Sequence, residues 1–186
     1  MTSSSAPAKP MRADARRNYE KVVATASKAF RESGIDTPLD DIARRAGVGP
    51  GTLYRHFPTR EALIAAAMRQ DTAELVDSAR AVDHTDPTRR LVDWIEKLAR
   101  HVGAYQGLPE VLTSAGREPD GPLYTACAEL RQATAEILAA AKESGDVRED
   151  LTGEEVSTLA NMVAMGSGCV QARRLLELVV EGIRAR

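Results

Sequence analysis

Aromatic residues, cysteines and long apolar runs are all scarce in this chain of 186 residues. The two cysteines, Cys127 and Cys169, lie far apart and in no metal-like spacing, which argues against both a zinc site and a disulfide scaffold. No stretch approaches the roughly 18–20 apolar residues that span a bilayer, so we expect no membrane segment. The N-terminal residues are rich in Ser, Ala and Pro without an apolar segment, so no secretory signal is visible. We therefore expect a protein of the reducing cytoplasm that holds no metal.

Sequence signatures of catalysis are missing as well. The chain contains no Gly-rich phosphate loop and no nucleophile elbow. Its three histidines, His56, His84 and His101, fall in unrelated places. We therefore expect that the protein is not an enzyme and needs no cofactor.

The net charge of −2 conceals two unlike segments. Residues 1–60 hold eleven basic and six acidic side chains, a balance of +5, whereas residues 61–186 hold 14 basic and 21 acidic ones, a balance of −7. A basic segment joined to an acidic one is expected when only one end of a protein meets a polyanion such as nucleic acid. The alternative is that charge drifts by chance along the chain.

Apolar residues recur at steps of three and four along almost the whole chain, as they do in amphipathic helices. Gly and Pro separate these segments, so we expect an all-α protein of about eight or nine helices. Thr37 is expected to cap the second helix, with Pro38 at its first position. The expected helices cover residues 14–33, 38–46, 50–57, 58–82, 87–106, 123–142, 154–169 and 170–184.

One segment carries specific chemistry. Two short helices, 38–46 and 50–57, are joined at 47–49 by a tight turn with two glycines, a spacing typical of a helix-turn-helix. The second helix needs only a narrow buried stripe, which Leu53 and Phe57 supply. The remaining residues of that helix are then available to a major groove, namely Gly51, Thr52, Tyr54, Arg55 and His56.

This segment resembles the signature of tetracycline-repressor (TetR) type regulators, carried here by residues 39–63, LDDIARRAGVGPGTLYRHFPTREAL. The resemblance covers about residues 16–66. It implies a homodimer, in which each subunit has a three-helix DNA-binding head and a larger helical body that binds a small effector.

By position, the resemblance also implies roles for individual side chains. The residues implied to reach bases or nearby phosphates are Thr52, Tyr54 and Arg55. Those implied to meet the DNA backbone are Thr37, His56 and Arg60. Two positions depart from the family pattern, because Gly49 stands where many members have Ser and Asp40 stands where a base-reading Arg is common.

The chemistry of these side chains agrees with such roles. Arg55 can pair with two acceptors of guanine, a contact worth about 1–3 kcal/mol of discrimination. Tyr54 and His56 can donate to phosphate oxygens, which position a protein without identifying the sequence. Arg45, beside Arg44 at the end of the first helix of the motif, is a further DNA-binding candidate. Two alternatives stay open, a solvated face for Arg44 and Arg45 and a partly buried aromatic side chain for Tyr54.

The helical body offers less specific signals. A cavity inside a helical bundle is a natural ligand site, and apolar, aromatic and sulfur-bearing side chains of the body are candidates to line one. The alternative for each of them is an ordinary place in the core. The candidates are Trp94, Leu98, His101, Tyr105, Leu112, Cys127, Met162 and Met165.

The last two helices are expected to form the subunit interface. They carry apolar stripes interrupted by small residues, and two such helices can pack against their symmetry mates as an isologous four-helix interface. The alternative is that they pack within one subunit. The candidate interface residues are Leu159, Val163, Ser167, Leu175, Leu178 and Val179.

Taken together, the sequence predicts a flexible tail (1–13), a helix-turn-helix DNA-binding domain (14–60) and an effector-binding and dimerisation domain (61–186). The expected function is that of a repressor, released from a pseudo-palindromic operator in double-stranded DNA by a small-molecule effector. The alternative is a constitutive regulator without an effector.

Overall fold

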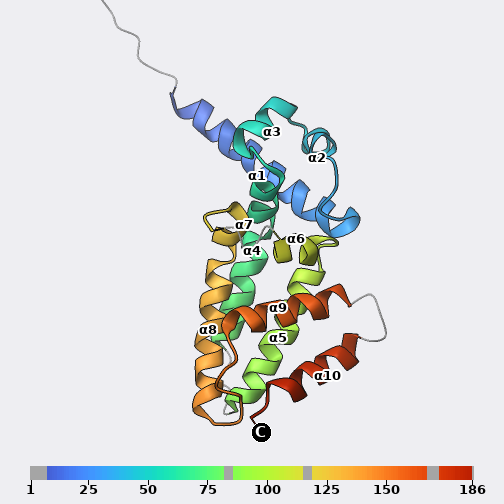
Figure 1. Ribbon diagram of the computed structural model, residues 1–186. Coiled ribbons are helices and arrows are strands. Elements are labelled where there is room, and N and C mark those ends of the chain that lie inside the picture. The colour runs from blue at the N-terminus through green and yellow to red at the C-terminus, as the bar shows by residue number, and fades with distance from the viewer. Residues whose placement is uncertain (1–7, 82–85, 115–118, 167–171, 186) are drawn as a thin grey trace, which may run out of the picture. The chain divides into compact units, whose positions relative to one another are not determined.

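The computed structural model describes residues 8–81, 86–114, 119–166 and 172–185, and nearly all of this backbone is helical (Figure 1). Within those ranges the strand-like pairing is limited to an isolated bridge between Val147 and Arg184. The expected all-α class is therefore confirmed. A search of the same ranges finds no helix with the length and apolar character to cross a membrane.

The chain folds into two compact units, Met1–Ala67 and Met68–Arg186. The division falls inside a long helix, seven residues beyond the boundary expected at residue 60. The helices that begin in the first unit are α1 (Ala8–Ser33), α2 (Leu39–Ala46), α3 (Pro50–His56) and α4 (Arg60–Ala81). The others are α5 (Pro87–Gly103), α6 (Leu108–Ser114), α7 (Pro122–Ala126), α8 (Ala128–Glu143), α9 (Gly153–Met165) and α10 (Ala172–Ile183).

In the first unit, α1 packs against both α2 and α3, which also contact each other. Their shared core is apolar, and Phe30 of α1, Ile42 of α2 and Leu53 of α3 are completely buried in it. Phe57, directly after α3, is buried as well. The narrow stripe predicted for the second helix of the motif is therefore correct, and the opposite side of α3 is left out of the core.

Gly47 ends α2 in the left-handed region, with φ of 69°. In that conformation its N–H reaches back to the carbonyl oxygens of Ala43 and Arg44, and the N–H of Val48 also donates to Ala43 O at 3.0 Å, so the carbonyl groups at the helix end are paired. A side chain at this φ is strained by about 1 kcal/mol or more, so the glycine is required by the tight turn of the motif.

We expect Gly47→Ala to lower the melting temperature of the protein, by about 2–4 °C for each 1 kcal/mol of strain. The matched variant Gly51→Ala should raise it slightly, because Gly51 lies inside α3, has open space at the Cβ position and lowers helix propensity relative to Ala. Thermal unfolding followed by circular dichroism measures both. Equal shifts in the two variants would contradict the role of backbone conformation at Gly47.

The first helix begins at Ala8, six residues before the expected start. Residues 8–13, expected in a flexible tail, are therefore helical, and the rest of that tail lies outside the described residues. Pro10 does not prevent this, because it falls in the first turn, where a missing N–H costs no helical hydrogen bond.

Two further helix boundaries differ from the sequence-based expectation. Gly107 and Pro109 are expected only to interrupt a helix, but α6 starts between them, with Gly107 at φ of 85° and Pro109 in the first turn. The single helix expected at 123–142 is two, α7 and α8, because Cys127 leaves the helical conformation at ψ of 4°.

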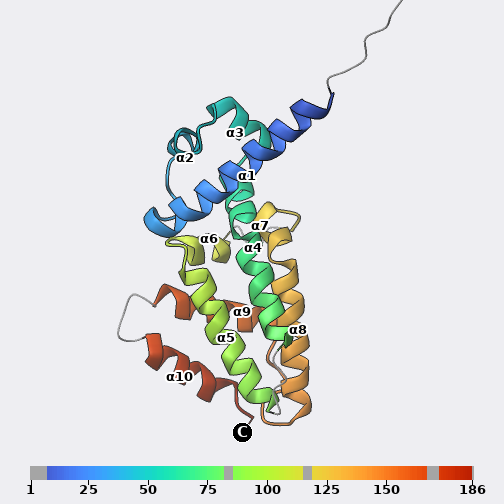
Figure 2. The ribbon, with the colours of Figure 1, turned by 180° about the vertical axis from the view of Figure 1, so that it is seen from behind.

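In the second unit, α5 is the central helix and packs against both α8 and α9. It buries a stripe of side chains that includes Leu91, Trp94 and Leu98. Figures 1 and 2 place the C-terminal part of α4 between α5 and α8. An ion pair of 4.0 Å between Arg80 of α4 and Glu136 of α8 agrees with this arrangement.

The last two helices are fixed at one end by local bonds. Thr152 and Glu155 form a capping box at the start of α9, each side chain accepting a hydrogen bond from the other residue's backbone N–H. After α10, the backbone pairs with the loop before α9, where Arg148 N donates to Ile183 O at 3.0 Å. The C-terminal end of α10 is thereby attached to the start of α9.

Candidate nucleic-acid interface and ligand pocket

The outward side of α3 presents polar side chains. Since Leu53 and Phe57 point into the core, Tyr54 and Arg55 between them face solvent, and Tyr54 is 45% exposed. Thr52 is half-buried, and Gly51 has no heavy atom within 4 Å of the position of a Cβ. A surface could therefore approach the backbone of α3 closely at Gly51. Tyr54 is thus accessible over almost half of its surface, which is compatible with a contact to DNA and with the alternative of a partly buried aromatic side chain.

The two arginines at the end of α2 differ in their partners. Arg44 forms an ion pair of 2.8 Å with Asp41, whose pKa is lowered by the hydrogen bond from Arg44. Arg45 and Arg55 are exposed, and neither has a carboxylate within ion-pair distance among the described residues. These two guanidinium groups are therefore the ones most available to an external anion on α2 and α3.

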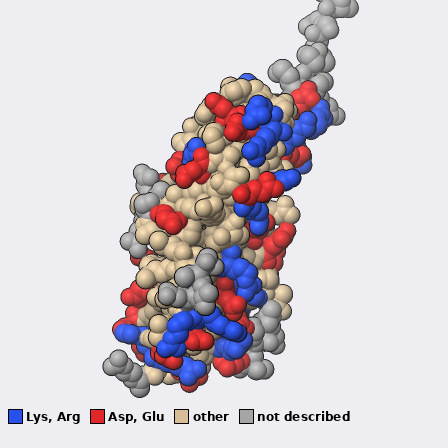
Figure 3. All heavy atoms as spheres, turned by 90° about the vertical axis from the view of Figure 1, so that its right-hand side faces the viewer, with Lys and Arg blue, Asp and Glu red and all other residues tan. Residues whose placement is uncertain are grey.

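Some of the basic side chains among the first 60 residues are paired with acids of the same helix. On α1, Arg16 pairs with Glu20 at 2.8 Å and Lys28 with Glu32 at 3.9 Å, each one helical turn apart. The face of the molecule in Figure 3 shows Lys and Arg interspersed with Asp and Glu. These pairs leave the net balance of +5 unchanged, but they place part of the positive charge beside an acid, whereas Arg45 and Arg55 have no carboxylate within ion-pair distance among the described residues.

Two predicted DNA-contacting side chains have internal roles. Thr37 is buried and its hydroxyl donates to Gly34 O at 2.8 Å, so it neither caps α2 nor faces outward. The N-cap position belongs to Pro38. Arg60 donates from Nη1 to Ile35 O at 2.6 Å and to Thr37 O at 2.7 Å, so its guanidinium joins the start of α4 to the loop between α1 and α2.

We expect Arg60→Ala to destabilise the first unit by about 2–3 kcal/mol, because hydrogen bonds from a charged donor are strong and two carbonyl oxygens lose their partner. Chemical denaturation monitored by circular dichroism measures the change. Arg44→Ala is the control, since its exposed pair with Asp41 contributes little. If both variants unfolded at the same denaturant concentration, Arg60 would have no structural role.

His56, the other residue expected at the DNA backbone, belongs to an aromatic cluster. Its ring lies edge-on to Tyr19 of α1, with centroids 5.9 Å apart, and Tyr19 also contacts Phe57 at 5.1 Å. The histidine is half-buried by these neighbours. The cluster fixes the last turn of α3 on α1 and leaves part of the imidazole accessible.

A pocket of about 470 Å³ lies within the second unit. Its wall combines aliphatic side chains from α5 and α8 with polar ones from α7, α8 and α9. The lining residues are Leu98, Val102, Leu112, Pro119, Tyr124, Cys127, Leu130, Arg131, Gly153, Glu154, Ser157, Thr158 and Asn161.

Leu98, Leu112 and Cys127 line the pocket as predicted. The other aromatic candidates and the histidine do not line it. Trp94, His101 and Tyr105 form hydrogen bonds with side chains of α4 and α8 instead. Trp94 is buried, with its Nε1 donating to Thr134 at 2.9 Å, and the Tyr105 hydroxyl donates to Asp71 at 2.5 Å. His101 Nε2 is hydrogen-bonded to Thr72 Oγ1 at 3.2 Å.

The two methionine candidates are also excluded from the pocket. Met162 and Met165 lie on the outer side of α9, 59% and 55% exposed. Their apolar character suggested a buried place, but the period of α9 turns them away from α5. On this helix, the hydrophobic character of a side chain therefore does not predict that it is buried within the subunit.

The polar pocket residues Tyr124, Arg131 and Asn161 were not identified from the sequence. Tyr124 lies on α7, and the break at Cys127 brings it back over Arg131 of α8. No periodicity predicts that contact. An Arg and an Asn within amphipathic helices are indistinguishable by pattern from solvated surface residues.

Burial raises the pKa of the Cys127 thiol, and the nearby positive charge of Arg131 opposes this only in part. The thiolate is the nucleophile, so we expect Cys127 to react with iodoacetamide more slowly than an unfolded cysteine at neutral pH. Alkylation followed by mass spectrometry in a Cys169→Ser background measures the rate. A rate equal to that of the guanidinium-unfolded protein would contradict a buried, protonated thiol.

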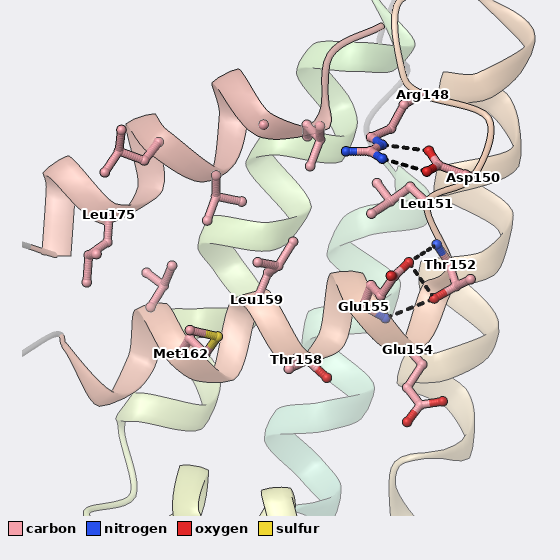
Figure 4. Close-up of a pocket in the computed structure, with 15 residues that line it drawn as sticks. Arg148, Asp150, Leu151, Thr152, Glu154, Glu155, Thr158, Leu159, Met162 and Leu175 are labelled. Atoms are coloured by element: carbon pink, nitrogen blue, oxygen red, sulfur yellow. Dashed lines mark hydrogen bonds and ion pairs between the residues drawn. The ribbon is translucent and has the colours of Figure 1, made fainter.

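A second, larger groove of about 840 Å³ lies between α9 and α10 (Figure 4). Five of the predicted interface residues line it, and Ser167 lies outside the described residues. The Arg148–Asp150 ion pair and the Thr152–Glu155 capping box close one end. Met162, Leu175 and Leu178 are exposed here, so this side of the two helices is apolar and uncovered in the single chain. The lining interface candidates are Leu159, Val163, Leu175, Leu178 and Val179.

A helix-turn-helix with an exposed second helix, followed by a helical unit with its own pocket, defines a class of DNA-binding regulators. Comparison with known proteins agrees. The family model for bacterial regulatory proteins of the tetR family matches residues 22–67, and the model for the C-terminal domain of SbtR-like transcriptional regulators matches residues 86–185.

Individual relatives support the same assignment. A TetR transcriptional regulator from Streptomyces coelicolor is 35% identical, with 89% of this chain and 97% of that one covered and a TM-score of 0.57. Thermus thermophilus FadR, a TetR-family repressor in complex with lauroyl-CoA, is 25% identical, with 90% and 95% covered and a TM-score of 0.62.

A curated HTH-type transcriptional regulator of Staphylococcus aureus is 37% identical over 62 residues, which is 33% of this chain and 34% of that protein. The match to the curated relative thus spans about a third of its length. The chain belongs to the TetR family of bacterial transcriptional regulators. Its function is accordingly DNA binding in the regulation of transcription.

Proposed function

We propose that this protein is a repressor that binds a pseudo-palindromic operator as a homodimer and is released when a small molecule occupies the 470 Å³ pocket. The observation that carries the proposal is the combination, in one chain, of an outward-facing α3 and a separate pocket in the second unit. In bacteria such a regulator acts in the cytoplasm.

On the DNA side, α3 enters the major groove. Arg55 reads a guanine through its unpaired guanidinium, and Tyr54 and Thr52 contact phosphates or bases beside it. Arg45 and His56 contribute backbone contacts, and Gly51 allows the helix to approach closely. The exposure of Tyr54 and Arg55 supports this assignment, as does the lack of a carboxylate within ion-pair distance of Arg45 among the described residues.

The second copy of the chain covers the apolar side of α9 and α10. Exposed leucines on α10 and exposed methionines on α9 support an isologous interface, in which each pair of helices meets its symmetry mate. A two-fold dimer places two copies of α3 about one turn of DNA apart, roughly 34–36 Å or more, which demands a pseudo-palindromic operator.

For the effector, the proposal rests on thermodynamic linkage. A ligand releases the operator only if it binds the DNA-incompetent form more tightly than the DNA-bound form. The complex of the Thermus relative with lauroyl-CoA supports a ligand-holding role for a unit of this fold.

Footprinting on DNA upstream of the protein's own gene tests the proposal, with and without candidate ligands. We expect a protected two-fold site whose affinity falls steeply with salt, since phosphate contacts release counterions. Absence of any sequence-specific protection would refute the proposal.

A constitutive regulator without an effector is the second candidate function. It is favoured by the modest size of the pocket. A thermal-shift screen separates the two, because a ligand that binds the folded state raises the melting temperature and an effector-free protein would respond to none.

A further inference from the structure

The pocket carries a positive charge that is held in place before any ligand binds. The guanidinium carbon of Arg131 stacks 3.7 Å from the centre of the Tyr124 ring, and its Nη1 donates to Tyr124 O at 2.7 Å. Stacking fixes the plane of the group, and the hydrogen bond fixes its rotation in that plane. A binding group fixed in this way loses little entropy when it captures a partner.

This charge has no internal counter-ion in the described part of the chain. No carboxylate there lies within ion-pair distance of Arg131, and its Nε and Nη2 donate no hydrogen bond to a described residue. Glu154 also lines the pocket, but it is exposed on α9 and makes a different interaction. A half-buried guanidinium without a counter-ion favours an anion from outside, and its two open nitrogens match the two oxygens of a carboxylate.

The rest of the pocket wall is mainly apolar or neutral. Leu98, Val102 and Leu130 present aliphatic surface that is almost completely buried. Asn161 adds an amide that has no hydrogen-bond partner among the described residues, so it can serve a second polar atom of a ligand. Arg131 is half-buried in this wall, and attraction between opposite charges is stronger in partly buried surroundings than in bulk water.

We propose that the pocket binds a small amphipathic carboxylic acid, whose carboxylate pairs with Arg131 and whose apolar body packs on Leu98, Val102 and Leu130. The inference rests on the proposed function in one respect, that this pocket is the effector site. It adds the chemical class of the effector, an anion with an aliphatic or compact cyclic body.

Three probes of equal length test the charge preference, namely octanoic acid, octanamide and octylamine. Calorimetric titration of the full-length protein should give an affinity for the acid about tenfold or more above that for the amide, and the amine should bind most weakly. Arg131→Gln should abolish the preference for the acid. Glu129→Gln, at an exposed position of α8 outside the pocket, should keep it, and Arg131→Lys should give an intermediate preference because the charge is retained but the paired geometry is lost.

Circular dichroism of each variant establishes that it is folded, and protection of Cys127 from alkylation by octanoic acid reports occupancy of the pocket independently. Equal binding of acid and amide, tighter binding of the amine, an unaltered preference in Arg131→Gln, or no saturable binding of the acid would each overturn the inference. Operator binding is measured in parallel, with and without octanoic acid, so that the ligand class and the proposed repressor mechanism are tested separately. Acid binding without operator release would leave the ligand class standing and contradict the repressor mechanism.

Discussion

Leu178→Asp should convert the protein from a dimer to a monomer and reduce its affinity for a two-fold operator by about 100-fold or more. Leu178 lies on α10 and is 47% exposed in the single chain, beside Leu175 in the groove between α9 and α10. A carboxylate here would be buried twice in an isologous interface, once from each subunit, and removing two charges from water is costly. Because two linked heads bind far more tightly than one, loss of the dimer removes most of the operator affinity.

Sedimentation velocity and fluorescence anisotropy on a full operator measure the two effects. Ala139→Asp is the matched control, since it places the same charge at an exposed position of α8. Affinity for a single half-site should be nearly unchanged in both variants. A Leu178→Asp protein that remained dimeric would show that the apolar side of α10 is not the subunit interface.

Arg55→Ala should cost about 1–3 kcal/mol at each half-site, and the loss should be confined to the specific operator. The side chain is exposed on α3 and has no carboxylate partner among the described residues, so nothing within the first unit competes for it. Binding to random DNA depends mainly on phosphate contacts and should change little. The ratio of specific to non-specific affinity should therefore fall.

Competition titrations with operator and random duplexes measure this ratio. Arg45→Ala is the informative comparison, because removal of a cation that binds phosphate should weaken binding to both duplexes alike and lessen its salt dependence. Arg89→Ala, an exposed arginine of α5 paired with Asp93 at 3.0 Å, should alter neither. If Arg55→Ala weakened both duplexes equally, Arg55 would bind phosphate and not a base.

The helix-turn-helix could be predicted closely because its determinants are local. The buried stripe of Leu53 and Phe57, the glycine turn and the outward position of Tyr54 all follow from residues within one or two helical turns. The internal bonds of Arg60 could not be predicted, for the opposite reason. Its partners are backbone oxygens, and a carbonyl at residue 35 leaves no trace in the sequence near residue 60.

The pocket was harder to predict because tertiary packing decides it. Trp94, His101 and Tyr105 have the size and polarity expected of a ligand site, yet each has a hydrogen-bond partner 29 to 40 residues away in the chain. Arg131 is placed in the pocket wall by the break at Cys127, a residue that carries no strong signal for ending a helix. Only the relative position of several helices brings these side chains to one place.

The attachment of Arg60 to two main-chain oxygens has an evolutionary consequence. The acceptors are present whatever side chains occupy positions 35 and 37, so mutation at either position cannot delete them. Selection for this contact therefore acts on position 60 alone. Among close relatives, the loop side chains are free to diverge in response to other pressures, while arginine at position 60 should be retained.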